Sequence, residues 1–345
     1  MPRELIATGP SQAALQMYKE QVLANDEVRV RTLFSSPKHG SGLRSFRANT
    51  KDYTSPFDRK RGIHHGPPMQ PTYPQPLGNM AVGEVIEVGV EVDQWGIGDH
   101  VFSHLPIRDT HTLKANRVQP VPSNMSPQAI VYNDPAGVAL CAIQASEIML
   151  GSTVAVFGLG AIGQMAAQQA KLQGARQVFV SDPILIRREL AIKHGADIAI
   201  DPSSDDAGEL IRDHTNNVGV DISIEASANY AGMNDAIRST GYAGRIVSAA
   251  YYVGDSSILS FEGEWHRNQL TILTTRDVNP TLRNAPRWDT KRLHNEAFEL
   301  LKEERLSVDG LIHPIVPFED CVEAYLATDQ RPSESIKLGI RHTED

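Results

Sequence analysis

A chain of 345 residues exceeds what one ordinary hydrophobic core holds, so its length predicts two domains. Hydrophobic residues make up 41% and charged residues 22%, which is the composition of an ordinary globular protein. The net charge of −9 argues against partners that need a basic surface, so neither nucleic acid nor an anionic membrane is expected to bind.

Apolar stretches and cysteines indicate the compartment. The N-terminal segment has no apolar run typical of a signal peptide, and stretches such as "TVAVFGLGAIG" fall short of the roughly 20 residues of a membrane span. Cys141 and Cys321 are the only cysteines and lie in unrelated contexts, so no disulfide framework is expected and a reducing cytoplasm is favoured. The same count excludes a structural zinc site built from several thiolates.

The first 135 residues or so predict a compact, irregular β domain. They contain short β-rich segments, "EVRVRTLF", "AVGEVIEVG" and "DHVFSHL", which are separated by proline and glycine clusters. Residues 49–76 form a polar, proline-rich stretch without a clear periodicity. A loop of that length is more often functional or a lid than a mere connection.

From about Gly151 the pattern changes to an alternation of strands and helices. Strand-like runs occur at "TVAVFG", "QVFVSD", "DIAID", "VDISIEAS", "GRIVSAA" and "LTILTT", and stretches such as "AIGQMAAQQAKLQGA" between them are helical. Such an alternation predicts an α/β class with a doubly wound parallel sheet. The tail, with a helix at "RLHNEAFELLKEERL" and a closing strand at "SIKLGI", is expected to return to the first domain. The expected domains are therefore 1–135 with 290–345, and 136–289.

The segment "VAVFGLGAIG" carries a dinucleotide-binding pattern. Gly158, Gly160 and Gly163 have G-x-G-x-x-G spacing, and they follow an apolar strand and open a helix. Gly158 permits the tight turn, Gly160 lets a pyrophosphate approach the backbone, and Gly163 lets the helix lie close to the sheet. The alternative is a related domain that binds another nucleotide or none.

The next strand ends in "VSDP", which places Asp182 where a carboxylate accepts hydrogen bonds from the adenosine ribose. A carboxylate there repels a 2′-phosphate, so NAD is favoured over NADP. Two alternatives remain, because Asp182 could instead cap the next helix and Arg187 or Arg188 could accommodate a phosphate. The remaining expected cofactor contacts are Ala161, Ile162, Arg187, Ala226, Ala249 and Tyr251.

Three further segments carry a family resemblance: "GEVIEVGVEVDQWGIGDHVF", "NDPAGVALCAI" and "SIKLGI". Together with the glycine motif, the chain resembles a medium-chain dehydrogenase/reductase of the branch that holds zinc alcohol, sorbitol and threonine dehydrogenases, over nearly its whole length. The resemblance implies a GroES-like β domain followed by a Rossmann domain, an active site in the cleft between them, and a homodimer or homotetramer.

The resemblance also implies positions for a catalytic zinc, and here the chain departs from the family. His39, in "KHGSGL", stands at the position of the family's first cysteine ligand, and Asp134, in "NDPAG", matches a position that is acidic in some members. In "GNM", Asn79 replaces the histidine of Gly-His-Glu and Met80 replaces the glutamate. An asparagine amide is a poor zinc ligand, so no metal is expected.

The loop between 49 and 76 offers one alternative. His64 or His65 could join His39 and Asp134 and rebuild a metal site, although a solvated pair is the simpler interpretation of these two histidines.

Without zinc, side chains must stabilise the developing alkoxide and move one proton. Ser41 matches the family's hydroxyl relay, His39 could serve as a general acid or base, and Asn79 and Asp134 could orient either partner. His39 and Ser41 could equally fill the space of a lost metal. Phenols of Tyr251 and Tyr252 and the imidazoles of His104 and His111 are weaker candidates, for which packing and surface positions are the alternatives.

The polar residues expected in the cleft, among them Arg44, favour a hydroxylated small-molecule substrate. We therefore expect a cytoplasmic, NAD-dependent, zinc-independent dehydrogenase that interconverts a secondary alcohol and a ketone on a polyol- or sugar-like substrate. The alternatives are an NADPH-dependent quinone or enone reductase and a non-catalytic NAD-binding protein.

Overall fold

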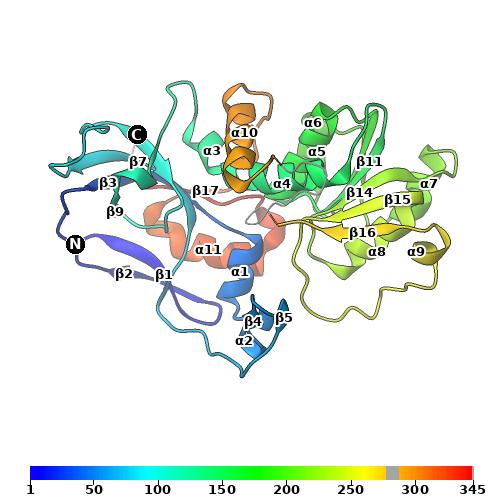
Figure 1. The fold of residues 1–345 in the computed structure, drawn as a ribbon, viewed down its shortest axis with the longest axis horizontal. Coiled ribbons are helices and arrows are strands. Elements are labelled where there is room, and N and C mark those ends of the chain that lie inside the picture. The colour runs from blue at the N-terminus through cyan, green and yellow to red at the C-terminus, as the bar shows by residue number, and fades with distance from the viewer. Residues whose placement is uncertain (277–286, 344–345) are drawn as a thin grey trace. The chain divides into compact units, whose positions relative to one another are not determined.

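The computed structural model describes residues 1–276 and 287–343. The chain divides into two compact units, Met1–Val131 with Ile312–Asp345, and Tyr132–Leu311 (Figure 1). No helix within the described ranges is long and apolar enough to cross a bilayer.

The first unit is built on a seven-stranded, mainly antiparallel sheet and a smaller three-stranded sheet (Figure 1). The large sheet has the order β10-β8-β7-β3-β18-β17, with β9 also paired to β3, and the small sheet has the order β2-β1-β6. The strands are β1 (Arg3–Gly9), β2 (Gln12–Met17), β3 (Glu27–Pro37), β6 (Gln75–Pro76), β7 (Asn79–Val88), β8 (His100–Ser103), β9 (Thr110–Lys114), β10 (Gln119–Pro120), β17 (Ile315–Pro317) and β18 (Gly339–Arg341). Buried valines of the central strands, such as Val28, Val30 and Val85, form its core.

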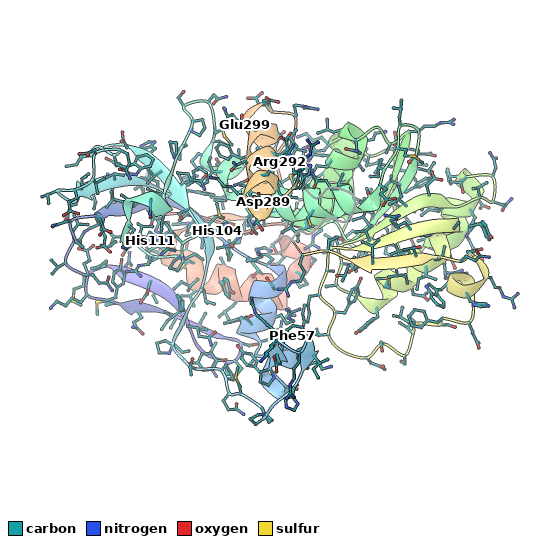
Figure 2. The ribbon with its side chains drawn as sticks, viewed as in Figure 1. Phe57, His104, His111, Asp289, Arg292 and Glu299 are labelled. Atoms are coloured by element: carbon teal, nitrogen blue, oxygen red, sulfur yellow. The ribbon has the colours of Figure 1, made fainter. Side chains whose placement is uncertain are left out.

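Short helices accompany these sheets. They are α1 (Gly40–Phe46), α2 (Lys51–Thr54), α3 (Pro127–Val131) and α11 (Cys321–Gln330), with 3-10 turns at Ala115–Arg117, Phe318–Asp320 and Pro332–Glu334. The stretch 49–76 contains local structure of its own, because α2 is followed by a small hairpin of β4 (Phe57–Asp58) and β5 (Ile63–His64). Phe57 in this hairpin is exposed (Figure 2).

The second unit contains the predicted parallel sheet, with strands in the order β13-β12-β11-β14-β15-β16. These are β11 (Thr153–Phe157), β12 (Gln177–Ser181), β13 (Ile198–Ile200), β14 (Val220–Glu225), β15 (Thr240–Ser248) and β16 (Thr271–Thr274). Its helices are α4 (Asn133–Ser146), α5 (Ala161–Leu172), α6 (Leu185–Lys193), α7 (Ala207–His214), α8 (Tyr230–Ser239), α9 (Glu264–Arg267) and α10 (Thr290–Lys302). Figure 1 shows α5 and α6 on one side of these strands and α8 on the other, as a doubly wound sheet requires.

The tail helix lies in the second unit, whereas the sequence pattern assigned the chain from residue 290 onward to the first domain. Asp289 caps α10 by accepting a hydrogen bond from the Arg292 amide at 2.7 Å, and Figure 2 shows both side chains on this helix. The buried stripe of α10 packs against α4, where His294 lies against Gly137. The chain enters the first unit only after Leu311, because the partner of an amphipathic helix is not encoded in its own periodicity.

Candidate active site

The glycine turn between β11 and α5 has the geometry that its three glycines predict. Gly158 has φ of +85°, a conformation that favours glycine. A Cβ on Gly163 would lie 1.8 Å from the Gly158 carbonyl oxygen, so only glycine lets α5 begin this close to the turn. A Cβ on Gly160 would meet nothing within 4 Å, which leaves the backbone open toward a ligand at the N-terminus of α5. Ala161 and Ile162 form the first turn of this helix.

Asp182 follows β12 and fastens the glycine turn. Its Oδ2 accepts a hydrogen bond from the Leu159 amide at 2.7 Å, and its Oδ1 accepts one from the Ile184 amide at 2.9 Å. The side chain is 3% exposed, so the carboxylate is buried beside the turn. Ile184 caps α6, and the carboxylate therefore both holds the turn and supports the start of the next helix.

The two arginines of α6 are engaged by carboxylates. Arg187 lies 3.6 Å from the Asp182 carboxylate, and Arg188 lies 2.9 Å from the Asp201 carboxylate and also donates to the Asp182 carbonyl oxygen. A 2′-phosphate would have to compete with these carboxylates for either guanidinium. Both guanidinium groups therefore already have a carboxylate partner.

Ala226 and Ala249, two predicted cofactor contacts, lie where β14 and β15 end. The Ala226 amide donates to the Phe157 carbonyl oxygen and the Ala249 amide donates to the Glu225 carbonyl oxygen, both at 2.8 Å. Tyr251 follows β15 with 42% of its surface exposed. These residues and the glycine turn share the carboxyl edge of the parallel sheet, where nucleotides bind in such folds.

Sequence reasoning missed Glu225, the last residue of β14. It is fully buried and accepts hydrogen bonds from the Ser227 amide and hydroxyl and from the Tyr252 hydroxyl. Burial raises the pKa of Glu225, although these hydrogen bonds oppose the shift. Burial and the neighbouring Glu225 carboxylate raise the pKa of Tyr252, so this phenol is committed to Glu225 and is not a proton donor to a carbonyl. A carboxylate at the end of the buried strand "VDISIE" was the available signal.

The first unit brings three predicted catalytic residues to neighbouring strand ends. Pro37, the last residue of β3, is paired with Asn79, the first residue of β7. His39 stands two residues beyond β3, at the N-terminus of α1, and Ser41 is exposed in the first turn of that helix. The antiparallel pairing of β3 with β7 thus places an imidazole, a hydroxyl and an amide on one edge of the unit.

The closing segment of the chain fixes this edge. The Leu338 amide donates to His39 Nε2 at 3.1 Å, and the buried Lys337 ammonium donates to the Pro37 carbonyl oxygen at 3.0 Å. An imidazole that accepts at Nε2 is neutral and carries its proton on Nδ1. Asp134 belongs to the other unit, where it is 5% exposed in the first turn of α4.

Comparison with known proteins identifies the family. A family model described as zinc-binding dehydrogenase matches residues 161–288. The chain is 34% identical to the D-guloside 3-dehydrogenase of Escherichia coli (strain K12), in an alignment that covers 98% of this chain and 99% of the relative. The chain belongs to the medium-chain dehydrogenase/reductase superfamily, in its zinc-type branch.

Solved structures agree with the fold of this dehydrogenase. The 2R,3R-butanediol dehydrogenase from Bacillus subtilis matches with a TM-score of 0.77 at 20% identity, covering 99% of this chain and all of that one. A protein from Sinorhizobium meliloti 1021 that was solved with NADP bound matches with a TM-score of 0.78 at 18% identity, covering 99% of both chains. The two units are thus a GroES-like domain and a Rossmann domain. Its membership of the family, shown by the full-length relative, makes the protein an NAD(P)-dependent oxidoreductase acting on CH–OH groups.

The donors at the positions where the family resemblance implies zinc ligands do not fit a zinc ion. The first unit presents an imidazole whose Nε2 already accepts from the Leu338 amide, and the uncharged amide of Asn79. Zinc prefers thiolates, imidazoles with an open nitrogen and carboxylates. Across the described part of the chain, no three His, Cys, Asp or Glu side chains come together as a possible metal site. His64, a candidate for a rebuilt site, has its Nδ1 2.6 Å from the Ser55 carbonyl oxygen.

The weaker histidine candidates of this dehydrogenase have different environments. His104 is exposed, whereas His111 on β9 is 4% exposed, so the alternative of a surface position is wrong for His111 (Figure 2). Burial, with Arg108 and His342 nearby, lowers the pKa of His111 well below its usual value. His111 is therefore a neutral residue of the first unit's interior and has no part in proton transfer there.

Proposed function

We propose that this protein is an NAD-dependent, zinc-independent dehydrogenase that interconverts a secondary alcohol and a ketone on a sugar- or polyol-like substrate. The observation that carries the proposal is the polar set at the ends of β3 and β7. By the family resemblance, His39 and Asn79 correspond to metal-ligand positions and Ser41 to the proton relay. Asn79 begins β7 opposite the end of β3, and His39 accepts a hydrogen bond from the Leu338 amide. Neutral hydrogen-bonding groups of this kind suit a hydroxylated substrate.

The proposed roles follow from exposure and hydrogen bonding. Ser41 is exposed at the start of α1, so its hydroxyl is the group that would hydrogen-bond the reacting substrate oxygen and pass its proton to solvent. His39 holds the β3–α1 connection through Leu338, and Asn79 and Asp134 would orient substrate hydroxyls. The nicotinamide cofactor supplies the hydride exchange when it is bound.

The glycine turn, Asp182 and the edge formed by Ala226, Ala249 and Tyr251 would hold the cofactor. We propose NAD in preference to NADP because Asp182 is a buried carboxylate beside the turn and Arg187 is already paired with it. The solved relative that binds NADP is only 18% identical and does not bear on this choice.

Sequence similarity to a sugar-derivative dehydrogenase supports the proposed class of substrate. A relative that matches over nearly the full length is named D-guloside 3-dehydrogenase, and a guloside is a sugar derivative. We propose a substrate of this class. We also propose that the protein is cytoplasmic and forms a homodimer or homotetramer. Light scattering after gel filtration would test the oligomeric state.

The deciding experiment combines metal analysis with cofactor and substrate titration on protein purified without a metal-affinity tag. The expected result is less than stoichiometric zinc, tighter binding of NADH than NADPH, and turnover of glycosides or polyols that chelators do not inhibit. Stoichiometric zinc needed for turnover would overturn zinc independence. Tighter NADPH binding with turnover of quinones or enones would favour the reductase, and NADH binding without turnover in the screen would favour a non-catalytic protein.

A further inference from the structure

Three strands of the parallel sheet end together beside the glycine turn. The main chain joins them, because Ala226 donates to the carbonyl oxygen of Phe157 on β11 and Ala249 donates to that of Glu225 on β14. The segments that follow β14 and β15 leave the sheet from this point. Their positions determine the wall that a dinucleotide would meet opposite the turn.

The side chain of Glu225 connects these two segments. One carboxylate oxygen accepts from the Ser227 amide at 2.8 Å and from the Ser227 hydroxyl, both in the segment after β14. The other oxygen accepts from the hydroxyl of Tyr252, in the segment after β15. One carboxylate therefore ties two chain segments to each other and to the sheet.

The segment after β14 is in direct contact with the glycine turn. A Cβ on Gly158 would lie 2.5 Å from the backbone of Ser227, and a Cβ on Gly232 of α8 would lie 2.5 Å from the Ser227 hydroxyl. Ala228 has φ of +60°, a left-handed conformation that a non-glycine residue adopts at a cost. A shift of Ser227 would therefore be transmitted to the turn itself.

The segment after β15 is held through Tyr252. Its ring stacks on Tyr230 of α8 with centroids 5.2 Å apart, and its hydroxyl also lies 3.4 Å from the Ser248 hydroxyl. Tyr251, the next residue back along the chain, is a proposed cofactor contact. Fixing Tyr252 thus fixes the backbone that presents Tyr251.

The Glu225 carboxylate lowers the stability of the folded chain compared with an uncharged side chain of the same size. Glu225 is fully buried, and its partners in the described chain are neutral hydroxyl and amide groups, with no cation among them. A buried carboxylate with neutral partners costs free energy that an uncharged side chain of the same size avoids. A buried charged side chain beside a ligand site is typical of residues that position that site.

We propose that Glu225 is a positioning residue of the cofactor site, which acts through Tyr252 and Ser227 to hold the segments after β15 and β14 against the glycine turn. The inference rests on the proposed cofactor site at this edge. Glu225 itself touches neither cofactor nor substrate in this role. The hydrogen bond from the Tyr252 hydroxyl to Glu225 then determines the position of Ala249 and Tyr251. It can be removed by substitution without changing either of those two residues.

The test is a fluorescence titration of NADH and NADPH into the wild type, Tyr252→Phe, Glu225→Gln and the double variant, with the thermal midpoint of each. Tyr252→Phe removes one hydroxyl and should raise the Kd for NADH about 10-fold. Glu225→Gln keeps an acceptor for Ser227 and a neutral link to Tyr252, so we expect a smaller rise, about 3-fold. The double variant should bind no more weakly than Tyr252→Phe alone, since both changes act on one hydrogen bond.

Ser223→Ala is the matched control, because Ser223 is buried on the same strand and shares a hydrogen bond of 2.7 Å with the Thr240 hydroxyl, away from the edge. It should lower the thermal midpoint and leave the Kd unchanged. The inference is overturned if Tyr252→Phe stays within twofold of the wild type, if the two effects multiply in the double variant, or if Ser223→Ala weakens binding as much. A wild type that binds neither dinucleotide would overturn the proposed function as well.

Discussion

Gly160 and Gly163 stand three residues apart in one turn, yet the space around each differs completely. A Cβ on Gly163 would overlap the Gly158 carbonyl oxygen, whereas a Cβ on Gly160 would meet nothing. We expect Gly163→Ala to lower the free energy of unfolding by about 1–3 kcal/mol. Gly160→Ala should change it by less than about 0.5 kcal/mol and still weaken NADH binding, because the methyl group occupies the approach of the pyrophosphate. Urea unfolding and NADH titration measure the two effects.

The pair serves as its own control. If Gly160→Ala binds NADH as tightly as the wild type, the dinucleotide does not pass over Gly160 and the proposed site is wrong. If Gly163→Ala is as stable as the wild type, α5 has room to move away from the turn.

In the first unit we expect His39 to have a structural role and Ser41 a chemical one. Removing the imidazole in His39→Ala leaves the amide of the buried Leu338 without its acceptor, so we expect a loss of about 1–3 kcal/mol in stability. Ser41 is exposed, so Ser41→Ala should leave stability within about 0.5 kcal/mol and reduce kcat on the order of 100-fold. Thermal melts and steady-state kinetics on the same preparations distinguish them. Full activity in Ser41→Ala would remove the hydroxyl from the proposed chemistry.

Among individual residues, the sequence predicted those whose role can be recognised from one short segment. The glycine spacing and the carboxylate after β12 follow from one short segment, and the structure brings them together at one edge. Glu225 was missed because its role depends on a register between β14 and β15 that places Tyr252 above it. The bond from Leu338 to His39 joins residues about 300 positions apart, which no local pattern encodes.

Among the elements, α10 shows how packing decides an assignment that periodicity leaves open. Alanine normally stabilises a helix by about 1 kcal/mol relative to glycine. In α4, however, a Cβ on Gly137 would lie 2.4 Å from Nδ1 of His294 on α10. We therefore expect Gly137→Ala to lower the free energy of unfolding by about 1 kcal/mol, with the sign reversed in a His294→Ala background, where the ring is gone. Urea unfolding of the four variants forms a double-mutant cycle.

The cycle tests the packing of α10 against α4 directly. If the changes in unfolding free energy caused by Gly137→Ala and His294→Ala were additive, α10 would not pack closely against Gly137 in solution. The six parallel strands were predictable because each has its own apolar run, whereas the boundary at residue 290 was not, because the buried stripe of α10, Leu293, Ala297 and Leu300, fits any apolar surface.

For the whole molecule, two buried histidines predict how stability depends on pH. Burial lowers the pKa of His111 well below its usual value, and burial lowers the pKa of His342 to about 3. In the described structure, His111 Nε2 and His342 Nδ1 have no hydrogen-bond partner, so a proton on either has no acceptor. Because both pKa values are lower in the folded chain than in the unfolded one, their stabilisation is complete above about pH 6.5 and is lost as the pH falls below it.

Between pH 7 and pH 5 His342 should cost about 2 kcal/mol of stability, and His111 should add a loss of the same sign. Urea unfolding across this range measures the slope, and His342→Gln should make it clearly shallower. His65→Gln is the control, because His65 is exposed in the folded chain as in the unfolded one. A slope that His342→Gln leaves unchanged would contradict the assignment.

Glu225 acts in the opposite direction. Its pKa is raised in the folded chain, so its protonation as the pH falls stabilises the second unit. Glu225→Gln removes this opposing contribution, and we expect that variant to be more stable than the wild type near pH 7 and to lose stability more steeply on acidification. A variant that gains stability at pH 7 while binding NADH more weakly would show that the same carboxylate lowers stability and positions the cofactor site.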